Sequence, residues 1–529
     1  MNLTLRYRLF FIIVFSVIFC QIPSALQLNF IGGFFGKNLN IYLIFFSFLY
    51  YAYYRYKNKE EYLTYVKKER YFFIYIIFYI SVLMISFFHG LFIYPYYDTI
   101  LSGPVVNLKG FSTVHDMLQY CGISLSELSL LKLWMIMKPM KRFFIDCFWF
   151  FSVPLLIYYW FKDDPCRGLE ILRKATICAV VCVSLYGVLD ILYLSGCMRA
   201  QIILMQTNPV VHSIKDNGSW WPPLLWDNQL RSLFAEPSYF GIYAAFSMPW
   251  VWYTLLKCRA WGKKLIFILL LFLFTYELFL TRARTANALF VGEIILLLGI
   301  VLWKYKNAFR GVIQILFISL FAFLMATYSI SYMPGSINRN DLDSMGYNSK
   351  GVQSITLYVE DNFTSIASSN QRSNLSRYSI LKANVAIGMD YPILGVGKDL
   401  RNGYVPDYLP SEAFEGEEIQ SWLRAQKEQG ILKMEFPQLG EYSTRFAETG
   451  ALGLMIYLFP AVYLLRSLLK VIASKRTTSL QKEQGIFLFL SMIGIMASGF
   501  GDTLYVTSCY WLLIGIGYAF VMSDKVMDV

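Results

Sequence analysis

Apolar runs of about 20 residues recur along the whole 529-residue chain. Only 16% of its residues are charged and 57% are hydrophobic, whereas soluble domains carry about 25% charged residues. A run of this length crosses roughly 30 Å of hydrocarbon as a helix, which satisfies its own backbone hydrogen bonds in lipid. The sequence therefore predicts an all-α polytopic membrane protein with about twelve transmembrane helices, at residues 8–26, 39–56, 71–95, 142–161, 174–196, 235–256, 264–281, 285–303, 310–332, 446–466, 485–500 and 503–523.

Basic residues in the short connecting loops predict the orientation of these helices. Lysine and arginine concentrate on the cytoplasmic side of a membrane. An even number of spans beginning inside places every short basic loop in the cytoplasm, including those that hold Lys67, Lys263 and Lys475, and leaves both termini cytoplasmic. We attribute the formal net charge of +12 to the basic loops on the cytoplasmic side and to their contact with anionic membrane lipids. We therefore expect no nucleic-acid partner.

Three long segments then lie on the extracytoplasmic side. The longest is too long for a simple connection, and its residues 371–388 and 412–433 have the apolar spacing of amphipathic helices. We therefore predict a partly helical cap over the membrane helices. The expected division is residues 1–332 with nine spans and the outer loops 96–141 and 197–234, residues 333–445 as the cap, and residues 446–529 with three spans.

Charged residues stand at the outer ends of several apolar runs. Arg231 and Glu236 precede one run, and Arg282 and Arg284 lie between two others. Moving such a charge into hydrocarbon costs roughly 2.5–3.5 kcal/mol on insertion scales, so each position is a functional-site hypothesis. Arginine remains protonated and binds phosphate through two parallel hydrogen bonds. The pattern indicates a site for a polyanion, and Glu277, seven residues before Arg284 on the same predicted helix face, is interpreted as its charge-balancing partner.

Metal chemistry has little support in the sequence. The chain has three histidines, His89, His115 and His212, without the spacing of metal ligands. Because arginines can supply the countercharge for phosphate, we predict no metal and no cofactor. Asp341 and Asp343, on the longest outer segment, leave a carboxylate–metal site open as an alternative.

Four motifs in this order resemble the O-antigen ligase/polymerase superfamily, over roughly residues 225–465. They are Arg231…Glu236-Pro-Ser…Gly241, Thr281-Arg-Ala-Arg284-Thr-Ala, Pro392-Ile-Leu-Gly395-Val-Gly397 and Phe446-Ala-Glu448-Thr-Gly450-Ala-Leu-Gly453. Arg377 and Gly388 are also similar to an Arg-x10-Gly pattern in the outer loops of Wzy-type polymerases. One departure is clear. Many relatives carry a His-Asn pair about eleven residues before the last motif's first glycine, where this chain reads Pro437-Gln-Leu-Gly-Glu441.

The resemblance implies a bacterial inner-membrane enzyme of the multi-helix, GT-C-like glycosyltransferase type, which contributes to lipopolysaccharide biosynthesis. Its expected activity is that of an O-antigen polymerase, which joins undecaprenyl-diphosphate-linked oligosaccharide repeat units at the periplasmic face. Two alternatives remain open: a ligase (WaaL-type) that transfers the glycan to lipid A core, and a transporter of lipid-linked oligosaccharides. The expected partners are the lipid-linked oligosaccharide and membrane lipids, and the resemblance also admits a chain-length regulator.

The candidate site residues follow from these motifs. Arg284 is assigned to the diphosphate, with Arg282 as second choice and Arg231 beside it. Glu236 is either the base that deprotonates the acceptor hydroxyl or a structural anchor for Arg231. The remaining candidates contact substrate: Arg377, which closes over the phosphate or orients the glycan, with Arg372 and Glu448, the latter an alternative base.

Overall fold

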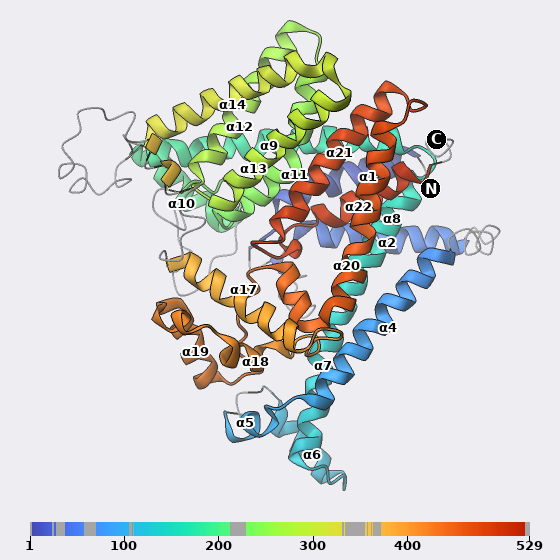
Figure 1. Cartoon of the computed structure of the whole chain (residues 1–529), viewed down its shortest axis with the longest axis vertical. Helices are drawn as coiled ribbons and strands as arrows, with labels where there is room; N and C mark the ends of the chain where they lie inside the picture. The colour runs from blue at the N-terminus through green and yellow to red at the C-terminus, as the bar shows by residue number, and fades with distance from the viewer. Residues whose placement is uncertain are drawn as a thin grey trace.

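The computed structural model describes residues 3–23, 26–27, 38–57, 70–104, 108, 110–211, 229–330, 333, 355–356, 358–360, 362 and 372–523. These residues form helices, turns and irregular segments without a strand (Figure 1). The predicted all-α class is therefore confirmed for the part of the chain that the structure describes.

The first half of the chain holds α1 (Leu3–Phe15) with the short η1 (Ser16–Ile18), α2 (Leu39–Lys57), α4 (Arg70–Ile93), α5 (Tyr97–Ser102), α6 (Phe111–Tyr120), α7 (Glu127–Cys147), a π-helical turn (Phe148–Ser152), α8 (Val153–Phe161), α9 (Pro165–Leu194) and α10 (Met198–Val211). The second half holds α11 (Pro237–Lys257), α12 (Trp261–Leu280), α13 (Arg284–Lys304), η8 (Lys306–Ala308), α14 (Phe309–Ile330), α17 (Arg372–Asp390), α18 (Arg401–Tyr408), η10 (Ser411–Glu415), α19 (Glu417–Gln429), α20 (Glu441–Ala473), α21 (Ser479–Ser498), η11 (Leu504–Val506) and α22 (Cys509–Val521).

Six helices in the described ranges are long and apolar enough to cross a membrane. They are Arg70–Ile93, Glu127–Phe161, Pro165–Leu194, Arg284–Lys304, Phe309–Ile330 and Glu441–Ala473, and Leu39–Tyr54 and Cys509–Val521 are shorter apolar helices. On α4, large apolar side chains such as Ile74, Ile77 and Phe78 are more than half exposed, a pattern that suits lipid and not water. The chain is thus a membrane protein. A helix overlaps each of the twelve predicted ranges, but the count of twelve spans stays a prediction.

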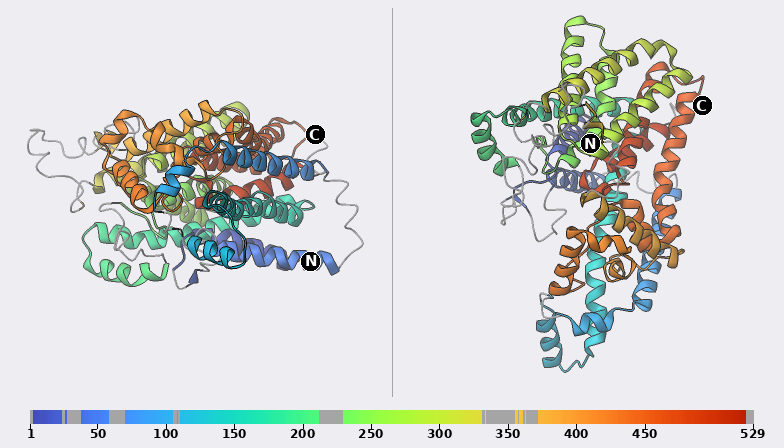
Figure 2. Two further views of the ribbon diagram at one scale, coloured as in Figure 1. Left: turned by 90° about the horizontal axis from the view of Figure 1, so that it is seen from below. Right: turned by 60° about the vertical axis from the view of Figure 1, so that its left-hand side comes forward.

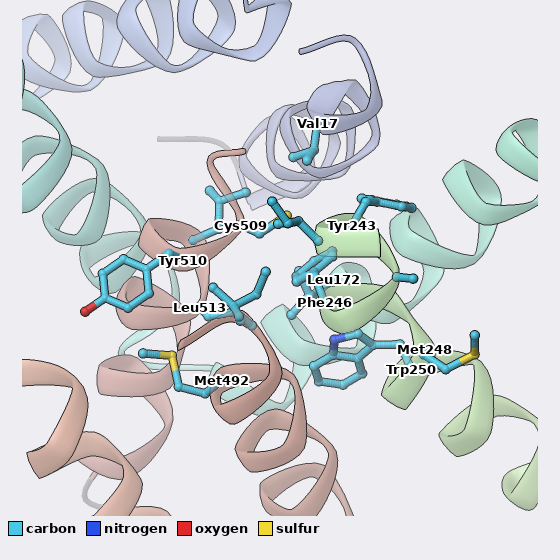
Figure 3. Packing of buried hydrophobic residues seen from close by; sticks show 14 of the residues in the cluster. Val17, Leu172, Tyr243, Phe246, Met248, Trp250, Met492, Cys509, Tyr510 and Leu513 are labelled. Atoms are coloured by element: carbon cyan, nitrogen blue, oxygen red, sulfur yellow. The ribbon is translucent and has the colours of Figure 1, made fainter. Parts of the chain in front are cut away.

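Helix α11 is the central helix of the membrane bundle, and it is buried along most of its length. Figure 3 shows Phe246 and Trp250 of this helix among side chains from α9, α21 and α22, including Leu172, Met492 and Leu513. Dense packing on all sides fixes α11 relative to its neighbours. The segment before α11, which carries the first motif, is therefore held at one end of the bundle.

A second hydrophobic core lies under the cap. It joins Tyr94 at the end of α4 and Leu131 on α7 to cap residues such as Ile380, Val405 and Phe436. Figures 1 and 2 show α17, α18 and α19 grouped at one end of the bundle, with α5 and α6 beyond them. Helices α17 and α19 overlap the two predicted helical ranges, but only α19 is amphipathic, because α17 has no distinct apolar face. The region predicted as the outer loop 96–141 differs from a loop, because it holds α5, α6 and most of α7.

The third and fourth motifs contact each other through their backbones. Gly450 has a φ of 63° and interrupts α20. The backbone N–H groups of Val396 and Gly397 donate to the carbonyls of Ala447 and Glu448, each at 2.9 Å, and Ala451 N–H donates to the Pro392 carbonyl at 2.7 Å. The segment 392–397 therefore supplies hydrogen-bond partners that the interrupted helix would otherwise lack. These motifs join the cap to α20.

Candidate functional site

Four segments that are distant in sequence meet around one small pocket at the cap end of the bundle, which we call the polar pocket. They are the first turns of α11 and α13, the first half of α17, and the turn between α21 and η11. The lining residues are Ser238, Ile242, Thr285, Ala286, Leu289, Arg377, Ser498, Gly501 and Asp502. Three predicted motif regions, those around Glu236, Arg284 and Arg377, thus come together.

The first turns of α11 and α13 pack closely beside this pocket. A Cβ added to Gly241 would lie 2.2 Å from the Cβ of Ala286, so the close approach of the two helices requires the glycine of the first motif. Glu236 is the N-cap residue of α11, Pro237 follows as the first helical residue, and the Ser238 hydroxyl donates to a Glu236 carboxylate oxygen at 3.3 Å. Two helix N-termini therefore direct partial positive charge toward the pocket, an arrangement that favours anions.

Arg231 occupies a different position from the one predicted. It is 2% exposed and is not among the residues that line the pocket. Its guanidinium donates to the Ala235 carbonyl at 3.2 Å, and the backbone N–H groups of Arg231 and Ser232 donate to one carboxylate oxygen of Asp190 at 3.1 and 2.7 Å. Burial lowers the pKa of Arg231, and Asp190 opposes that shift. Arg231 stabilises the turn that leads into α11.

Arg284 is the first residue of α13 and forms a link to the cap. Its guanidinium Nη1 donates to the side-chain oxygen of Asn374 on α17 at 2.7 Å. Arg282 lies in the preceding turn with a φ of 50°, a conformation that a non-glycine residue adopts at a cost of about 1–3 kcal/mol. The sequence offered no signal for Asn374, because its distance from Arg284 along the chain carries no information about their contact.

The predicted pairing of Glu277 with Arg284 rests on a shared helix face that the structure does not contain. Helix α12 ends at Leu280 and α13 begins at Arg284. Glu277 is buried against α9, where a Cβ added to Gly187 would lie 2.5 Å from its carboxylate oxygen. The prediction was wrong because the turn at 281–283 changes the direction of the chain.

Arg377 and Asp502 form the charged part of the pocket wall. The Arg377 guanidinium donates to the Gly501 carbonyl, and Thr503 N–H donates to one oxygen of Asp502 at 2.8 Å. Burial raises the pKa of Asp502, and the nearby guanidinium of Arg377 opposes the shift. Asp502 was not among the residues predicted for the site. The available signal was a carboxylate after Gly499-Phe-Gly501, in the turn between two predicted spans on the outer side.

Glu448 belongs to an ionic network outside the pocket. It is buried on α20 and accepts a hydrogen bond from Asp399 N–H at 3.2 Å. Arg142 of α7 pairs with Asp399 and, at 2.6 Å, with Glu435 of the cap. These contacts support a role for Glu448 in attaching the cap to α7 and α20, and the predicted substrate contact stays a prediction.

Several predicted residues lie where the structure gives no side-chain description. Arg372 begins α17, but its side chain is outside the described part, as are Asp341, Asp343 and His212. Among the residues that the structure describes, no group of three or more histidine, cysteine, aspartate or glutamate side chains is placed to hold a metal ion.

A comparison with known families finds a match to part of the chain. Residues 265–432 match the family model Wzy_C, described as O-Antigen ligase. This range begins in α12 and ends just after α19, so it includes Arg284, Arg377 and the segment 392–397, but neither Glu236 nor Asp502. A search of the curated proteins finds no match to the chain.

Proposed function

We propose that this chain, which residues 265–432 place in the O-antigen ligase/polymerase superfamily, is a glycan polymerase that joins lipid-diphosphate-linked oligosaccharide repeat units. The observation that carries the proposal is the meeting of two helix N-termini, Arg377 and Asp502 at one pocket beneath the cap, with Arg284 at its edge. Undecaprenyl diphosphate is the proposed carrier, and the periplasmic face of the inner membrane is the proposed location. A chain-length regulator is a further proposed partner.

The pocket offers complementary charge to a diphosphate. Guanidinium groups hold phosphate oxygens through charge-assisted, directional hydrogen bonds, and both arginines are already positioned by partners on other elements, Arg284 by Asn374 and Arg377 by the Gly501 carbonyl. The first turns of α11 and α13 add backbone dipoles of the same sign. The guanidinium groups are therefore held in place before an anion arrives, which favours electrostatic stabilisation. The cavity itself is only about 10 Å³, so it must widen to admit a diphosphate.

The reaction that follows is a displacement at the anomeric carbon. An acceptor hydroxyl forms the new glycosidic bond, the bond from the sugar to the diphosphate breaks, and the lipid diphosphate leaves with its electron pair. The arginines stabilise the negative charge that develops on the departing phosphate oxygen. A carboxylate takes the acceptor proton, and the two candidates beside the pocket are Glu236 and Asp502.

The position of the missing histidine favours Asp502 as that base. The segment where relatives carry the His-Asn pair ends at Glu441 in this chain, and Glu441 N–H donates to the Gly499 carbonyl at 2.8 Å. The turn that holds Asp502 is therefore adjacent to that position. Burial raises the Asp502 pKa, and a base becomes more effective as its pKa approaches the working pH.

The ligase is the second candidate, and the O-antigen ligase description of the matched family supports it. Donor and bond cleavage are the same in both reactions, and only the acceptor differs. A transporter of lipid-linked oligosaccharides would bind the same diphosphate but form no new bond. The carboxylates at the pocket support an enzyme over a transporter, since binding a diphosphate alone requires no base.

One assay separates the three candidates. The purified protein in nanodiscs receives a lipid-diphosphate-linked repeat unit, first alone and then with lipid A core. A ladder of longer glycans from the donor alone is the expected result. Product that appears only when lipid A core is present would identify a ligase, and the absence of new glycosidic bonds in both mixtures, with retained donor binding, would support the transporter.

A further inference from the structure

A buried ion pair lies at the start of α20, beside the turn that carries Asp502. Glu441 is the first residue of α20 and is 3% exposed, and Arg445, one helical turn later, is 6% exposed. The Arg445 Nε donates to one carboxylate oxygen of Glu441. Burying two charges costs free energy unless further hydrogen bonds satisfy them. The other contacts of this pair therefore indicate what it holds in place.

Glu441 binds the backbone of the turn on both sides of Asp502. Its own N–H donates to the Gly499 and Asp502 carbonyls, at 2.8 and 3.2 Å. Its second carboxylate oxygen accepts from the Leu504 N–H at 3.3 Å. One residue thus contacts the chain before, at and after the candidate base, so a change in the position of Glu441 is transmitted to Asp502.

Arg445 determines the orientation of the Glu441 carboxylate. Its guanidinium lies 3.9 Å from the centre of the Tyr457 ring and donates to the Tyr505 hydroxyl of η11 at 2.8 Å. Tyr505 donates in turn to Asp146 of α7 at 2.6 Å. The position of Arg445 is therefore fixed by three elements. From that position it directs the Glu441 carboxylate to the turn.

Charged and titratable groups approach Asp502 from three helices, namely Arg377 of α17, Tyr239 of α11 and Glu441 of α20. The α13 residues that line the pocket carry no charge. Burial raises the pKa of Asp502, and the Arg377 guanidinium and the hydrogen bond from the backbone N–H of the next residue lower it. The negative charge of Glu441 raises this pKa again, because a like charge disfavours ionisation.

We propose that Glu441 is a positioning residue, which holds the Asp502 carboxylate at the polar pocket and is itself oriented by Arg445. The proposal rests on the proposed function, in which Asp502 takes the proton of the acceptor hydroxyl. Glu441 does not line the pocket, so it acts through Asp502 and not on the substrate. An ion pair that only stabilised α20 would leave the pH dependence of the reaction unchanged.

The first variant removes the charge of Glu441 and keeps its size. With one negative charge fewer beside it, Asp502 ionises at lower pH, so Glu441→Gln should move the acid limb of the kcat/KM profile down by at least about 0.5 pH unit. Glu412→Gln is the matched control, since Glu412 is exposed on the cap, and its limb should stay in place. An unmoved limb in active Glu441→Gln would overturn the proposal.

The second variant keeps the charge and changes the reach. Glu441→Asp has a side chain one methylene shorter, which draws the carboxylate away from the Leu504 N–H. We expect kcat to fall on the order of tenfold, with KM for the donor within about twofold, because the arginines still hold the diphosphate. A change in KM at an unchanged kcat would contradict a role through Asp502.

A double variant replaces Glu441→Gln if that protein does not purify in a folded state. Glu441→Gln combined with Arg445→Gln leaves neither partner of the buried pair as an uncompensated charge. The acid limb should move in the same direction, and an unmoved limb would again overturn the proposal.

Carbodiimide labelling separates this proposal from the proposed function. A hydrophobic carbodiimide adds to protonated carboxyl groups, so mass spectrometry of the full-length protein in nanodiscs follows Asp502 without turnover. Half-maximal labelling of Asp502 should occur at lower pH in Glu441→Gln than in the unmodified protein. That shift, together with no glycan product in the nanodisc assay, would refute the polymerase and retain the control of Asp502 by Glu441. Glycan product with an acid limb that depends on Asp502 but does not move in Glu441→Gln would refute the positioning role and retain the polymerase.

Discussion

Arg284 and Arg377 approach the polar pocket from a membrane helix and from the cap, and each has a hydrogen-bond partner on another element. Such partners restrict the rotamers of two long side chains before any substrate binds. An arginine whose geometry is fixed in advance contributes more to a developing phosphate charge than a freely rotating one. These two arginines and the carboxylates beside them are therefore the proposed catalytic groups.

Replacing Arg284 should remove most of the rate. We expect Arg284→Ala to lower the elongation rate about a hundredfold, which corresponds to on the order of 3 kcal/mol of lost electrostatic stabilisation. Arg284→Lys should recover little, because an ammonium cannot form the paired hydrogen bonds of a guanidinium. The measurement is kcat/KM in nanodiscs. Arg310→Ala, at an exposed position on α14, is the control, and near-normal elongation by well-folded Arg284→Ala would contradict the assignment.

Asp502→Asn and Glu236→Gln should distinguish the two candidate bases. A base acts as its carboxylate, so the rate should rise with pH as pH passes through the raised pKa of Asp502 and level off above it. Asp502→Asn should lose activity and also lose this acid limb, whereas Glu236→Gln should retain the limb. The measurement is a pH–rate profile of kcat/KM. An unchanged profile in active Asp502→Asn would remove Asp502 from catalysis.

At the scale of elements, the break in α20 determines how the cap attaches. Gly450 has a positive φ, and a Cβ there would lie 2.3 Å from the Ile393 carbonyl oxygen. Gly395 is equally constrained, with a φ of 67° and the Glu448 carbonyl oxygen 2.5 Å from an added Cβ. These glycines allow two backbones to approach and exchange hydrogen bonds. In this structure the two motifs hold the cap against α20 through backbone hydrogen bonds.

Gly450→Ala should therefore destabilise the protein. The added methyl group meets a backbone carbonyl and the residue must keep a positive φ, so we expect a loss of at least about 1 kcal/mol. A lower apparent Tm of the purified protein is the readout. Gly299→Ala on α13 is the matched control, since nothing lies within 4 Å of its added Cβ, and its Tm should be unchanged or higher. Equal Tm values for both variants would contradict a strained backbone at Gly450.

At the scale of the whole molecule, the membrane bundle and the cap each have a hydrophobic core. Ion pairs join the two: Lys398 and Asp146 form a largely buried pair, and the half-buried Arg142 of α7 pairs with Asp399 and Glu435. A pair of this kind contributes little net stability but is costly to break on one side. The network therefore supports a defined cap position above α7 and α20.

The sidedness of the cap can be tested with two native cysteines. Cys121 is exposed at the end of α6, and Cys258 lies in the turn after α11, whose opposite end faces the polar pocket. A membrane-impermeant maleimide added to intact spheroplasts should label Cys121, whereas Cys258 should require permeabilised membranes. Loss of the maleimide label in Cys121→Ser would assign the label to this cysteine. Labelling of Cys121 only after permeabilisation would reverse the predicted orientation and place the site in the cytoplasm.

The positions of the helices could be predicted from the amino-acid sequence alone. Runs of apolar residues predict helices because lipid requires internally satisfied backbones, and the cap helices α17 and α19 followed from apolar spacing. Basic loops and motif order also brought Glu236, Arg284 and Arg377 to one predicted face, and the structure places all three beside one pocket or its edge. Each of these inferences depends on local composition and period.

The contacts between charged groups, in contrast, could not be predicted without the folded chain. Asp502, near the C-terminal end of the chain, lines the pocket. Glu448 accepts a hydrogen bond within the ionic network, and Arg231 stabilises the turn before α11. Glu277 lost its expected partner because three residues at 281–283 redirect the chain between two helices. Side-chain partners depend on the directions in which helices pack and on contacts between distant segments. Spacing along a single sequence specifies the face of one helix but not the neighbour that covers it.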